Sequence, residues 1–490
     1  MNFSIIAYIL GFVLKIESLL MLAPAMIGII YGEKEYSAFL IFGIIGILLG
    51  GAISFKKPKN QMFYAKEGFV SVALSWIVVS IYGSLPFVIN KDIPRFVDAF
   101  FEMVSGFTTT GASILADVES LSHASLFWRS FSHWIGGMGV LVFILSVLPI
   151  TGGATMHLMK AESPGPQVGK VVPKMRDTAV ILYVIYTVMT VFQMLILIIG
   201  KVPVFDAVTL AFGTAGTGGF SIKNSGVADY SSFAQYVIAT FMILFGVNFN
   251  VYFLIIRKKL KSAFSLEELR WYLSIIGFAV LFVTLNTLTK FTSIEETFRA
   301  AYFQVASIIT TTGFSTVDYN VIYPELSKAI LVLLMFCGAC AGSTGGGIKI
   351  SRIAILFKSV RDEVLRIIHP RAVRKIRFEN KVLDDSIVRS VYIFIAAYFM
   401  IFCSSFLIIS LDNFDFTTNF TAVASAINNI GPGLNVVGPC GNFSGYSDLS
   451  KLALSFNMLA GRLEIFPMLV IFSPSTWKRS AKIHKHKKTA

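Results

Sequence analysis

Ten long apolar runs recur along this chain of 490 residues, and they constrain its fold more than any other feature. A helix needs about 20 apolar residues to cross a bilayer. Charged residues make up only 14% of the chain, whereas a soluble protein has about 25%. This composition excludes a soluble enzyme, a disordered chain and a nucleic-acid-binding domain, and it predicts an all-α polytopic membrane protein. The runs occupy residues 3–30, 37–54, 68–90, 125–150, 178–200, 232–256, 270–289, 327–357, 387–411 and 448–473.

The basic residues gather in alternate loops between these runs, although the net charge of +14 could suggest a nucleic-acid partner. Most of the 42 lysines and arginines lie in residues 55–70, 151–178, 255–272, 349–390 and 476–490. Such a bias marks the cytoplasmic loops of a membrane protein, where basic side chains also face anionic lipid headgroups. An even number of spans then predicts that both termini are cytoplasmic. The first run lacks a cleavage pattern, which predicts an uncleaved span.

Four shorter apolar segments lie between the long runs. Each has about 13 residues, and a segment of this length is typical of a re-entrant or interfacial helix rather than a span. Each follows an outward span and precedes an inward one, so all four are predicted to dip into the membrane from outside. The segments are residues 96–108, 204–216, 296–310 and 416–428.

Each short segment ends in a similar glycine-containing string. The strings are Thr108–Ser113, Gly216–Ser221, Thr310–Ser315 and the more diverged Asn428–Gly433. They recur at intervals of about a hundred residues, which indicates four copies of one structural unit. We therefore expect four pseudo-symmetric units of span, pore loop and span around a central pore, preceded by two extra transmembrane helices. The expected boundaries are 1–66 for the two extra helices, then 67–175, 176–262, 263–380 and 381–490, the last with a basic cytoplasmic tail.

The strings have the chemistry of a cation path. A ring of backbone carbonyls can replace the hydration shell of a potassium ion, and glycine reaches the backbone angles that such a ring needs. Each preceding helix would point the negative end of its dipole at the axis. No string contains a charged residue, whereas an anion pore would need arginine or lysine rings. One T-T-T-G could be a simple helix C-cap, but four matched copies favour the ion path.

Two features of the inner half suggest gating. The small residues from Gly342 to Gly347 disfavour a regular helix, because each mid-helix glycine costs about 1 kcal/mol. Close helix packing through small residues is the alternative, and a Walker loop is absent. Arg462 lies within the last run, where an arginine costs about 2.5–3.5 kcal/mol, so it should face the pore or a partner. A pair with Glu464 is the alternative, although residues two apart do not share a helix face.

These features resemble the Trk/Ktr/HKT superfamily of potassium transporters. The four strings, the G-R-x-E of Gly461–Glu464, the two extra N-terminal spans and the K-A-E-S-P-G-P within Met156–Pro166 are similar to its TrkH branch. The resemblance implies potassium-selective uptake across the inner membrane through filter carbonyls. Those carbonyls would belong to Thr109, Thr110, Gly111, Thr217, Gly218, Gly219, Thr311, Thr312, Gly313, Asn429, Ile430 and Gly431. The fourth string lacks threonine, which implies a quasi-symmetric filter with looser selectivity than a fourfold channel, whereas the glycine in all four strings favours potassium.

The resemblance also implies a gate and partners. The gate would be an intramembrane loop, 338–349, containing Gly342, Ser343, Thr344, Gly345, Gly346 and Gly347, with Arg462 as an electrostatic barrier. The basic loop 358–390 would dock a separate TrkA-like cytosolic protein that binds nucleotides, and the chain would form a homodimer. No cofactor is expected on this chain, potassium is its transported ion, and no nucleic acid is expected to bind.

Two alternatives to a potassium-selective pore stay open at this point. One is a less selective K⁺/Na⁺ member of the same superfamily, and another is a carrier that couples potassium uptake to H⁺ or Na⁺. Carriers typically use two inverted repeats, so four repeats in the same orientation favour a pore. An enzyme is the other class of protein to consider, and it is not expected because the chain has no H-E-x-x-H or G-x-S-x-G motif. Cys337 and Cys340 are expected to pack rather than to bind a metal. All six histidines are expected in or near interfacial loops and the tail.

Overall fold

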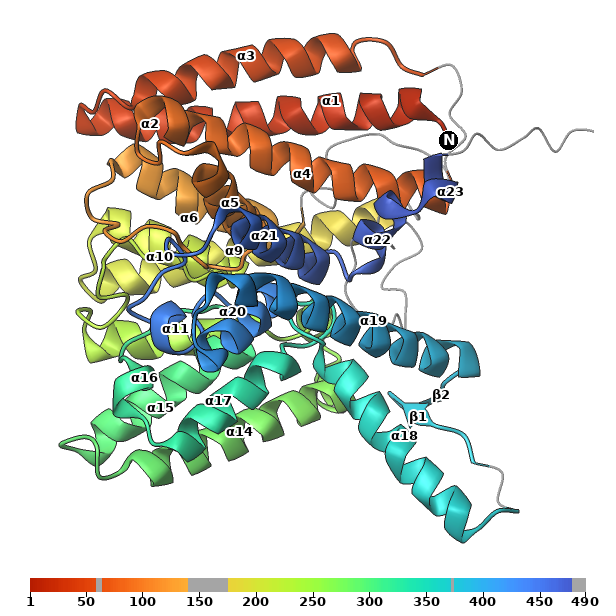
Figure 1. The fold of residues 1–490 in the computed structure, drawn as a ribbon. Coiled ribbons are helices and arrows are strands. Elements are labelled where there is room, and N and C mark those ends of the chain that lie inside the picture. The colour runs from red at the N-terminus through yellow and green to blue at the C-terminus, as the bar shows by residue number, and fades with distance from the viewer. Residues whose placement is uncertain (59–63, 140–174, 372–373, 478–490) are drawn as a thin grey trace, which may run out of the picture.

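The computed structural model describes residues 1–58, 64–139, 175–371 and 374–477 (Figure 1). Three sequence features lie outside these ranges. They are the K-A-E-S-P-G-P motif, the second half of the 125–150 run and the basic tail after Trp477. The description below concerns the remaining residues.

The first two apolar runs form an antiparallel pair at one edge of the bundle (Figure 1). Helices α1 (Phe3–Leu20) and α2 (Leu22–Tyr31) make one apolar stretch, and α3 (Tyr36–Ser54) returns beside α1. The turn begins at Gly32, whose φ of +70° suits a residue without a side chain. A Cβ on Gly50 would lie within 3.0 Å of the α1 backbone, so the small residue lets the two helices touch.

The same unit then occurs four times: a long helix, a short helix that ends at a string, and a second helix that is interrupted where it can be followed. The first copy consists of α4 (Ala65–Asn90), α5 (Phe96–Phe107) and α6 (His123–Gly137), and the second of α9 (Met175–Ile199), α10 (Val204–Gly216), α11 (Ser232–Phe245) and α12 (Phe249–Ile256). The third copy consists of α14 (Glu267–Thr287), α15 (Ile294–Ile309), α17 (Glu325–Cys337) and α18 (Ile350–Ile368). The fourth consists of α19 (Asp385–Ile409), α20 (Phe416–Asn428), α21 (Asp448–Arg462) and α22 (Phe466–Phe472). Short helices α13 (Leu260–Phe264), α16 (Tyr319–Ile322) and α23 (Pro474–Trp477) and two 3₁₀ turns, Ser410–Asp412 and Asn435–Val437, lie in the connections.

The prediction of continuous spans was wrong for the second helix of the second and fourth units, whereas the second half of the corresponding run in the first unit lies outside the described residues. Among the described residues, six helices are long and apolar enough to cross a bilayer, and α11 with α12 makes a seventh only as a pair bent by 90°. The 327–357 run is divided between α17 and α18 at the small-residue loop, as the sequence predicted, and the 448–473 run is divided after Arg462. Hydropathy averages side-chain character over about 20 residues, so it does not show where the backbone leaves the helix within such a run. The chain is therefore a polytopic membrane protein whose inner half is less regular than its hydropathy suggests.

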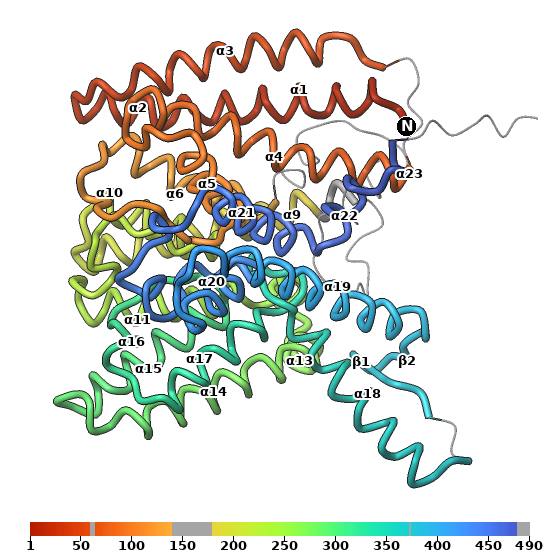
Figure 2. Tube along the Cα trace, in the orientation of Figure 1, coloured from red at the N-terminus to blue at the C-terminus, as the bar shows by residue number. Residues whose placement is uncertain are grey.

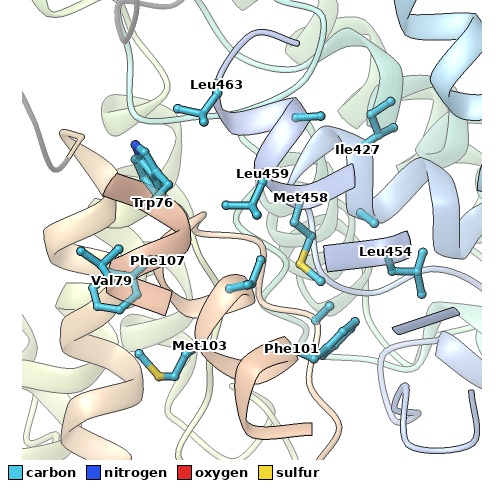
Figure 3. Packing of buried hydrophobic residues seen from close by; sticks show 14 of the residues in the cluster. Trp76, Val79, Phe101, Met103, Phe107, Ile427, Leu454, Met458, Leu459 and Leu463 are labelled. Atoms are coloured by element: carbon cyan, nitrogen blue, oxygen red, sulfur yellow. The ribbon is translucent and has the colours of Figure 1, made fainter. Parts of the chain in front are cut away.

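The four units close into a ring. Each short helix packs against the second helix of the preceding unit: α10 on α6, α15 on α11 and α20 on α17. The ring is completed by α5, which packs on α21 from the opposite end of the chain (Figure 2). Figure 3 shows this closure, with Phe101 and Met103 of α5 in the same buried cluster as Leu454 and Met458 of α21.

A small hairpin joins the two helices that project from the bundle, α18 and α19 (Figure 1). Strands β1 (Arg377–Phe378) and β2 (Lys381–Val382) pair antiparallel, with Arg377 opposite Val382. Both turn residues between them have positive φ, as a tight two-residue hairpin requires. Buried Phe378 packs in one cluster with residues of α18 and α19, so the hairpin holds the two helices together.

Candidate functional site

The four strings share one backbone conformation. The first residue of each predicted filter triplet is left-handed, with φ of +55° at Thr109, +55° at Thr217, +57° at Thr311 and +57° at Asn429. The triplet's glycine is left-handed as well, with φ of +81° at Gly111, +73° at Gly219, +84° at Gly313 and +104° at Gly431. The four triplets assigned from the sequence therefore share a backbone conformation as well as a sequence pattern.

Each string is also the C-cap of its short helix. In the first string, the N–H of Thr109 donates to the carbonyl of Gly106, and that of Thr110 donates to Ser105. The other three strings repeat this pair of bonds at the corresponding residues. The pattern is a Schellman motif, which satisfies carbonyls at the helix end and requires a left-handed residue after it. The C-cap and the proposed ion path are therefore not rivals, because the cap is what turns the chain out of the helix.

Threonine is an unusual choice for the left-handed position. A β-branched residue with positive φ is a genuine outlier, and left-handed backbone costs roughly 1–2 kcal/mol for an L-residue. Thr109, Thr217 and Thr311 all carry this cost in a fully packed setting. Strained backbone held by its surroundings is typical of functional sites. In the fourth string Asn429 takes the position, and asparagine tolerates this conformation better.

The glycines place the four strings in contact around a closed ring. A Cβ on Gly111 would lie within 3.0 Å of the carbonyl oxygen of Gly218, which is the residue before the next glycine. The same relation holds from Gly219 to Thr312 and from Gly313 to Ile430. It returns from Gly431 to Thr110, at 2.8 Å. A closed cycle of four glycine-to-carbonyl approaches requires that the strings meet at one axis.

The ring opens into a single hollow. This hollow is lined by all four glycines, together with residues of the loops that follow the strings. Lys223 and Arg129 are among its lining residues. The Nζ of Lys223 lies 4.4 Å from the centre of the Tyr230 ring. The C-terminal ends of the short helices α5, α10, α15 and α20 point at the ring from behind, which makes its centre favourable to a cation.

Hydrogen bonds hold the first and fourth strings against each other. Asn429 donates through Nδ2 to Thr110 Oγ1 at 3.0 Å and to the carbonyl of Met458 at 2.9 Å. Within the first string the hydroxyls of Thr108 and Thr110 lie 2.8 Å apart, and Thr310 and Thr312 repeat this distance in the third. The threonine hydroxyls therefore bond behind the backbone, and the fourth string replaces them with an amide that reaches its neighbour.

The segment between α17 and α18, residues 338–349, is a loop packed directly against the strings. The N–H of Gly346 donates to Thr311 Oγ1 at 2.6 Å. A Cβ on Gly346 would collide with the carbonyl of Asn428, and one on Gly345 would lie 2.9 Å from that of Thr310. The glycines therefore permit a close approach to the third and fourth strings, which larger residues would prevent.

The same loop is bonded to the break in the second unit. The N–H of Cys340 donates to the carbonyl of Gly246 at 3.1 Å, and Thr344 Oγ1 donates to Phe245 at 3.2 Å. In return, the N–H of Phe249 donates to the carbonyl of Gly342 at 3.1 Å. The polar backbone freed at both breaks is thus paired, as it must be at membrane depth.

Arg462 and Glu464 do not pair with each other. Arg462 donates to the carbonyl of Thr344 at 2.7 Å and to that of Gly137 at 2.6 Å, so it bridges the loop and the end of α6. Glu464 instead forms an ion pair with Arg352 of α18. The break at this point gives Glu464 a φ of +59°, which turns its side chain toward α18. The two charges therefore connect the last unit to the loop through Arg462 and to α18 through Glu464.

A buried ion pair beside the first two strings was missed by the sequence reasoning. Glu102 of α5 and Arg129 of α6 lie 2.8 Å apart, with side chains 0% and 2% exposed. Both residues fall within segments assigned to membrane depth, where an ionisable residue should have been treated as a candidate functional residue. That signal was used for Arg462 and overlooked for these two.

The expectation for the histidines was wrong for His133. It is fully buried, and its Nδ1 lies 2.8 Å from the carbonyl of Gly106. Its Nε2 accepts a hydrogen bond from the N–H of Phe220 at 3.2 Å, which assigns the proton to Nδ1. His133 therefore connects the first short helix to the second string. It lies in the interior of α6, within the predicted 125–150 run, and not in an interfacial loop.

Comparison with known proteins agrees with this architecture. A profile of the TrkH family, described as a cation transport protein, matches residues 35–479. The chain belongs to the TrkH family. This TrkH-family chain is 36% identical to the Trk system potassium uptake protein TrkH of Salmonella typhimurium over 98% of its length and 100% of that protein. It is 32% identical to the Trk system potassium uptake protein TrkG of Escherichia coli, covering 97% and 98% of the two chains.

A solved structure is similar in fold as well. The crystal structure of the potassium transporter TrkH from Vibrio parahaemolyticus superposes with a TM-score of 0.87 at 32% identity, covering 98% of this chain and all of that one. This TrkH-family chain is a transport protein rather than an enzyme, in keeping with the family's description. The predicted fold class, four pore-loop units after two extra helices, is confirmed by this likeness.

Proposed function

We propose that this chain takes up potassium ions across the cytoplasmic (inner) membrane through the ring of four strings. The observation that carries the proposal is the closed cycle in which each string's glycine abuts the carbonyl of the next string. Such a ring presents main-chain oxygens around one axis, and these can replace the water of an alkali cation. The relatives named as potassium uptake proteins, similar over nearly the whole chain, support potassium as the cargo.

The coordinating groups in this proposal are backbone carbonyls of the four triplets. Glycine and the left-handed residue before it shape the backbone, and the short-helix dipoles favour positive charge at the centre. The residues are Thr109, Thr110, Gly111, Thr217, Gly218, Gly219, Thr311, Thr312, Gly313, Asn429, Ile430 and Gly431. The diverged fourth string makes the ring quasi-symmetric, which keeps a less selective K⁺/Na⁺ transporter as the alternative.

The gate in this proposal is the loop formed by Gly342, Ser343, Thr344, Gly345, Gly346 and Gly347. Its backbone lies against the third and fourth strings, so an ion leaving the ring meets it at once. Arg462 adds a positive charge that is bonded to the carbonyl of Thr344. A displacement of the loop would open the path and release Arg462 from Thr344, leaving its bonds to Gly136 and Gly137 at the end of α6.

A chain of contacts supports control from the cytosol. Glu379 in the hairpin turn accepts the N–H groups of Glu267 and Glu268, at 3.1 and 3.0 Å, and so caps α14. Glu268 in turn accepts the N–H of Ala341, the residue before the small-residue loop, at 2.7 Å. A TrkA-like nucleotide-binding protein that docks on the basic segment 358–390 would therefore act two contacts away from the gate.

The remaining parts of the proposal concern placement and assembly. Phe3 and Trp477 stack with ring centroids 6.4 Å apart, so the two ends of the described chain lie on the same side, which we propose is cytoplasmic. The basic loops on that side would face anionic lipid. We propose a homodimer in which each protomer has its own pore.

The test is uptake of ⁸⁶Rb⁺ into vesicles that contain the purified protein, with K⁺ and Na⁺ as competitors. The proposal expects saturable uptake that K⁺ suppresses at lower concentration than Na⁺. Equal suppression by both ions would favour the less selective alternative. Single-channel currents in a planar bilayer are expected from a pore, whereas their absence beside an uptake that depends on a proton or sodium gradient would favour a coupled carrier.

A further inference from the structure

The ion pair of Glu102 and Arg129 lies at the junction between the first two strings. Arg129 Nε lies 2.9 Å from Glu102 Oε1, and the guanidinium carbon lies 4.1 Å from the centre of the Phe220 ring. Arg129 also donates through Nη1 to the carbonyl of Ser221 at 3.3 Å. One guanidinium therefore contacts both residues that follow Gly219 in the second string.

The carboxylate performs the same task for the first string. Glu102 accepts hydrogen bonds from the hydroxyl of Ser113, at 2.9 and 3.1 Å, and from the N–H of Ile114 at 3.0 Å. These are the second and third residues after Gly111. Since the pair is nearly inaccessible to water, its attraction is weakly screened and its geometry is restricted by packing. The first two strings are thus cross-linked by a charged fork on their outer side.

Among the described residues, the bonds that the loops around the strings form at the other three junctions are neutral. Lys451 of α21 and Asp98 of α5 form an ion pair at the closing junction, but this pair bonds to neither string. The N–H of Val227 donates to Ser315 at 2.9 Å, Tyr319 Oη donates to Gly433 at 3.1 Å, and the N–H of Phe443 donates to Ser113 at 2.9 Å. Gln304 occupies the position in α15 that Glu102 occupies in α5, nine residues before the glycine. Its amide atoms are buried without a hydrogen-bond partner in the described part of the chain.

We propose that the Glu102–Arg129 pair is a positioning element that sets the width of the ring between the first two strings, and thereby its discrimination between K⁺ and Na⁺. The inference rests on the proposed function of the ring. Arg129 is suited to it because its planar fork bonds two oxygens and stacks on Phe220 at the same time. A lysine has one nitrogen and keeps only the charge. The pair touches no ion; it acts through the backbone of Ser113, Ile114 and Ser221.

The pair also cancels its own charge beside the path. Arg129 lines the hollow outside the ring, where an unpaired guanidinium would repel incoming cations. Glu102 neutralises it at 2.8 Å. Replacing Glu102 should therefore lower the uptake of every cation. Replacing Arg129 by a residue without the guanidinium fork should instead change the preference for K⁺ over Na⁺. The two roles predict separate outcomes from the two partners.

The experiment measures ⁸⁶Rb⁺ uptake into vesicles with K⁺ or Na⁺ as the competing ion. The readout is the Na⁺ concentration that halves the uptake divided by the K⁺ concentration that does so. Arg129→Lys is expected to narrow this ratio by about threefold to tenfold, because remote packing contacts typically modulate a site on that scale. Ser113→Ala, a milder change that removes one hydroxyl from the fork, should narrow it in the same direction by less. Glu102→Gln should reduce uptake with a smaller change in the ratio. The matched control is Arg299→Lys, because Arg299 joins the neighbouring helices α15 and α11 through Glu295 at 3.0 Å and Gln235 at 2.7 Å but bonds to no string among the described residues.

The outcomes separate the inference from the function on which it rests. If the unaltered protein takes up no ⁸⁶Rb⁺, the proposed function fails. If it does, and folded Arg129→Lys and Ser113→Ala variants keep the original ratio, the inference is overturned. If Arg129→Lys does not fold, Ser113→Ala carries the decision alone. An equal change in Arg299→Lys would also count against a specific role for the pair.

Discussion

Replacing Gly313 by alanine should damage the ring more than its single methyl group suggests. Gly313 has a φ of +84°, where an L-residue pays roughly 1–2 kcal/mol. Its new Cβ would also lie within 3.0 Å of the carbonyl oxygen of Ile430 and 3.0 Å from Cδ of Pro432. Both obstacles are stiff, since one is backbone and the other a proline ring. The carbonyl must therefore retreat by on the order of 1 Å in an interior that is close-packed.

The magnitude follows from these two terms. Overpacking of a dense site costs about 1–3 kcal/mol, so the combined cost is about 2–5 kcal/mol. If even about 1.4 kcal/mol of it appears as lost ion binding, affinity falls tenfold. We therefore expect Gly313→Ala to reduce ⁸⁶Rb⁺ uptake about tenfold or more and to weaken the preference for K⁺ over Na⁺.

The assay needs a glycine whose replacement is harmless. Gly277 in α14 is helical and has no atom within 4 Å of an added Cβ. Gly277→Ala should leave uptake unchanged and stabilise the helix by up to about 1 kcal/mol. A folded Gly313→Ala protein with full uptake and unaltered Na⁺ competition would refute the reasoning. A loss of the same size in Gly277→Ala would do so as well, because it would show that the assay does not report on the ring.

Three further predictions concern the gate region and the fourth short helix. Arg462→Ala should raise basal ⁸⁶Rb⁺ uptake, because it removes a positive charge bonded to the gate loop; unchanged or reduced uptake in vesicles would contradict this. Glu464→Gln should lower thermal stability in detergent, since it leaves Arg352 buried without its partner, a change that typically costs about 3–5 kcal/mol. Asp415→Ala should cost about 1 kcal/mol, because Asp415 caps α20 by accepting the N–H of Thr418 at 3.0 Å. Hydrogen bonding from Thr418 lowers the pKa of Asp415, so this contribution should be complete above about pH 4 and disappear as the pH falls through the lowered pKa.

Controls for these variants come from the same chain. Lys328 pairs at 2.9 Å with a glutamate that is 90% exposed, so Lys328→Ala should change the melting temperature far less than Glu464→Gln. Asp415→Asn keeps an oxygen that can cap the helix but cannot titrate, so it should retain stability at neutral pH and lose the acid dependence. A melting curve of Asp415→Asn that keeps the original pH dependence would assign that dependence to another group.

The packing of the short helices holds the strained backbone of this ring in place. Three threonines hold a backbone conformation that threonine disfavours, and four glycines sit where any side chain would strike a neighbouring carbonyl. Neither arrangement would persist in an isolated hairpin. Both persist here because the short helices pack in a closed cycle, α10 on α6, α15 on α11, α20 on α17 and α5 on α21. The closed assembly imposes the geometry that the strings would not adopt alone.

Local patterns in the sequence determined much of this protein. The apolar runs specified the membrane and the long helices, because burial in lipid depends on the composition of about 20 consecutive residues. The four glycine strings indicated where each short helix ends, because glycine disfavours a helix interior. The small residues from Gly342 to Gly347 specified a break between α17 and α18 for the same local reason.

Only the tertiary structure decided which groups meet. The breaks after α11 and α21 carry no run of glycines that would predict them. Backbone groups at the break after α11 are paired by the loop 338–349, which is distant in the sequence. Glu464 pairs with Arg352 rather than with Arg462, and Glu102 pairs with Arg129, because ring closure brings those side chains within bonding distance. Hydropathy and spacing describe one stretch of chain at a time. The partner of a buried charge depends on how four such stretches pack around a common axis.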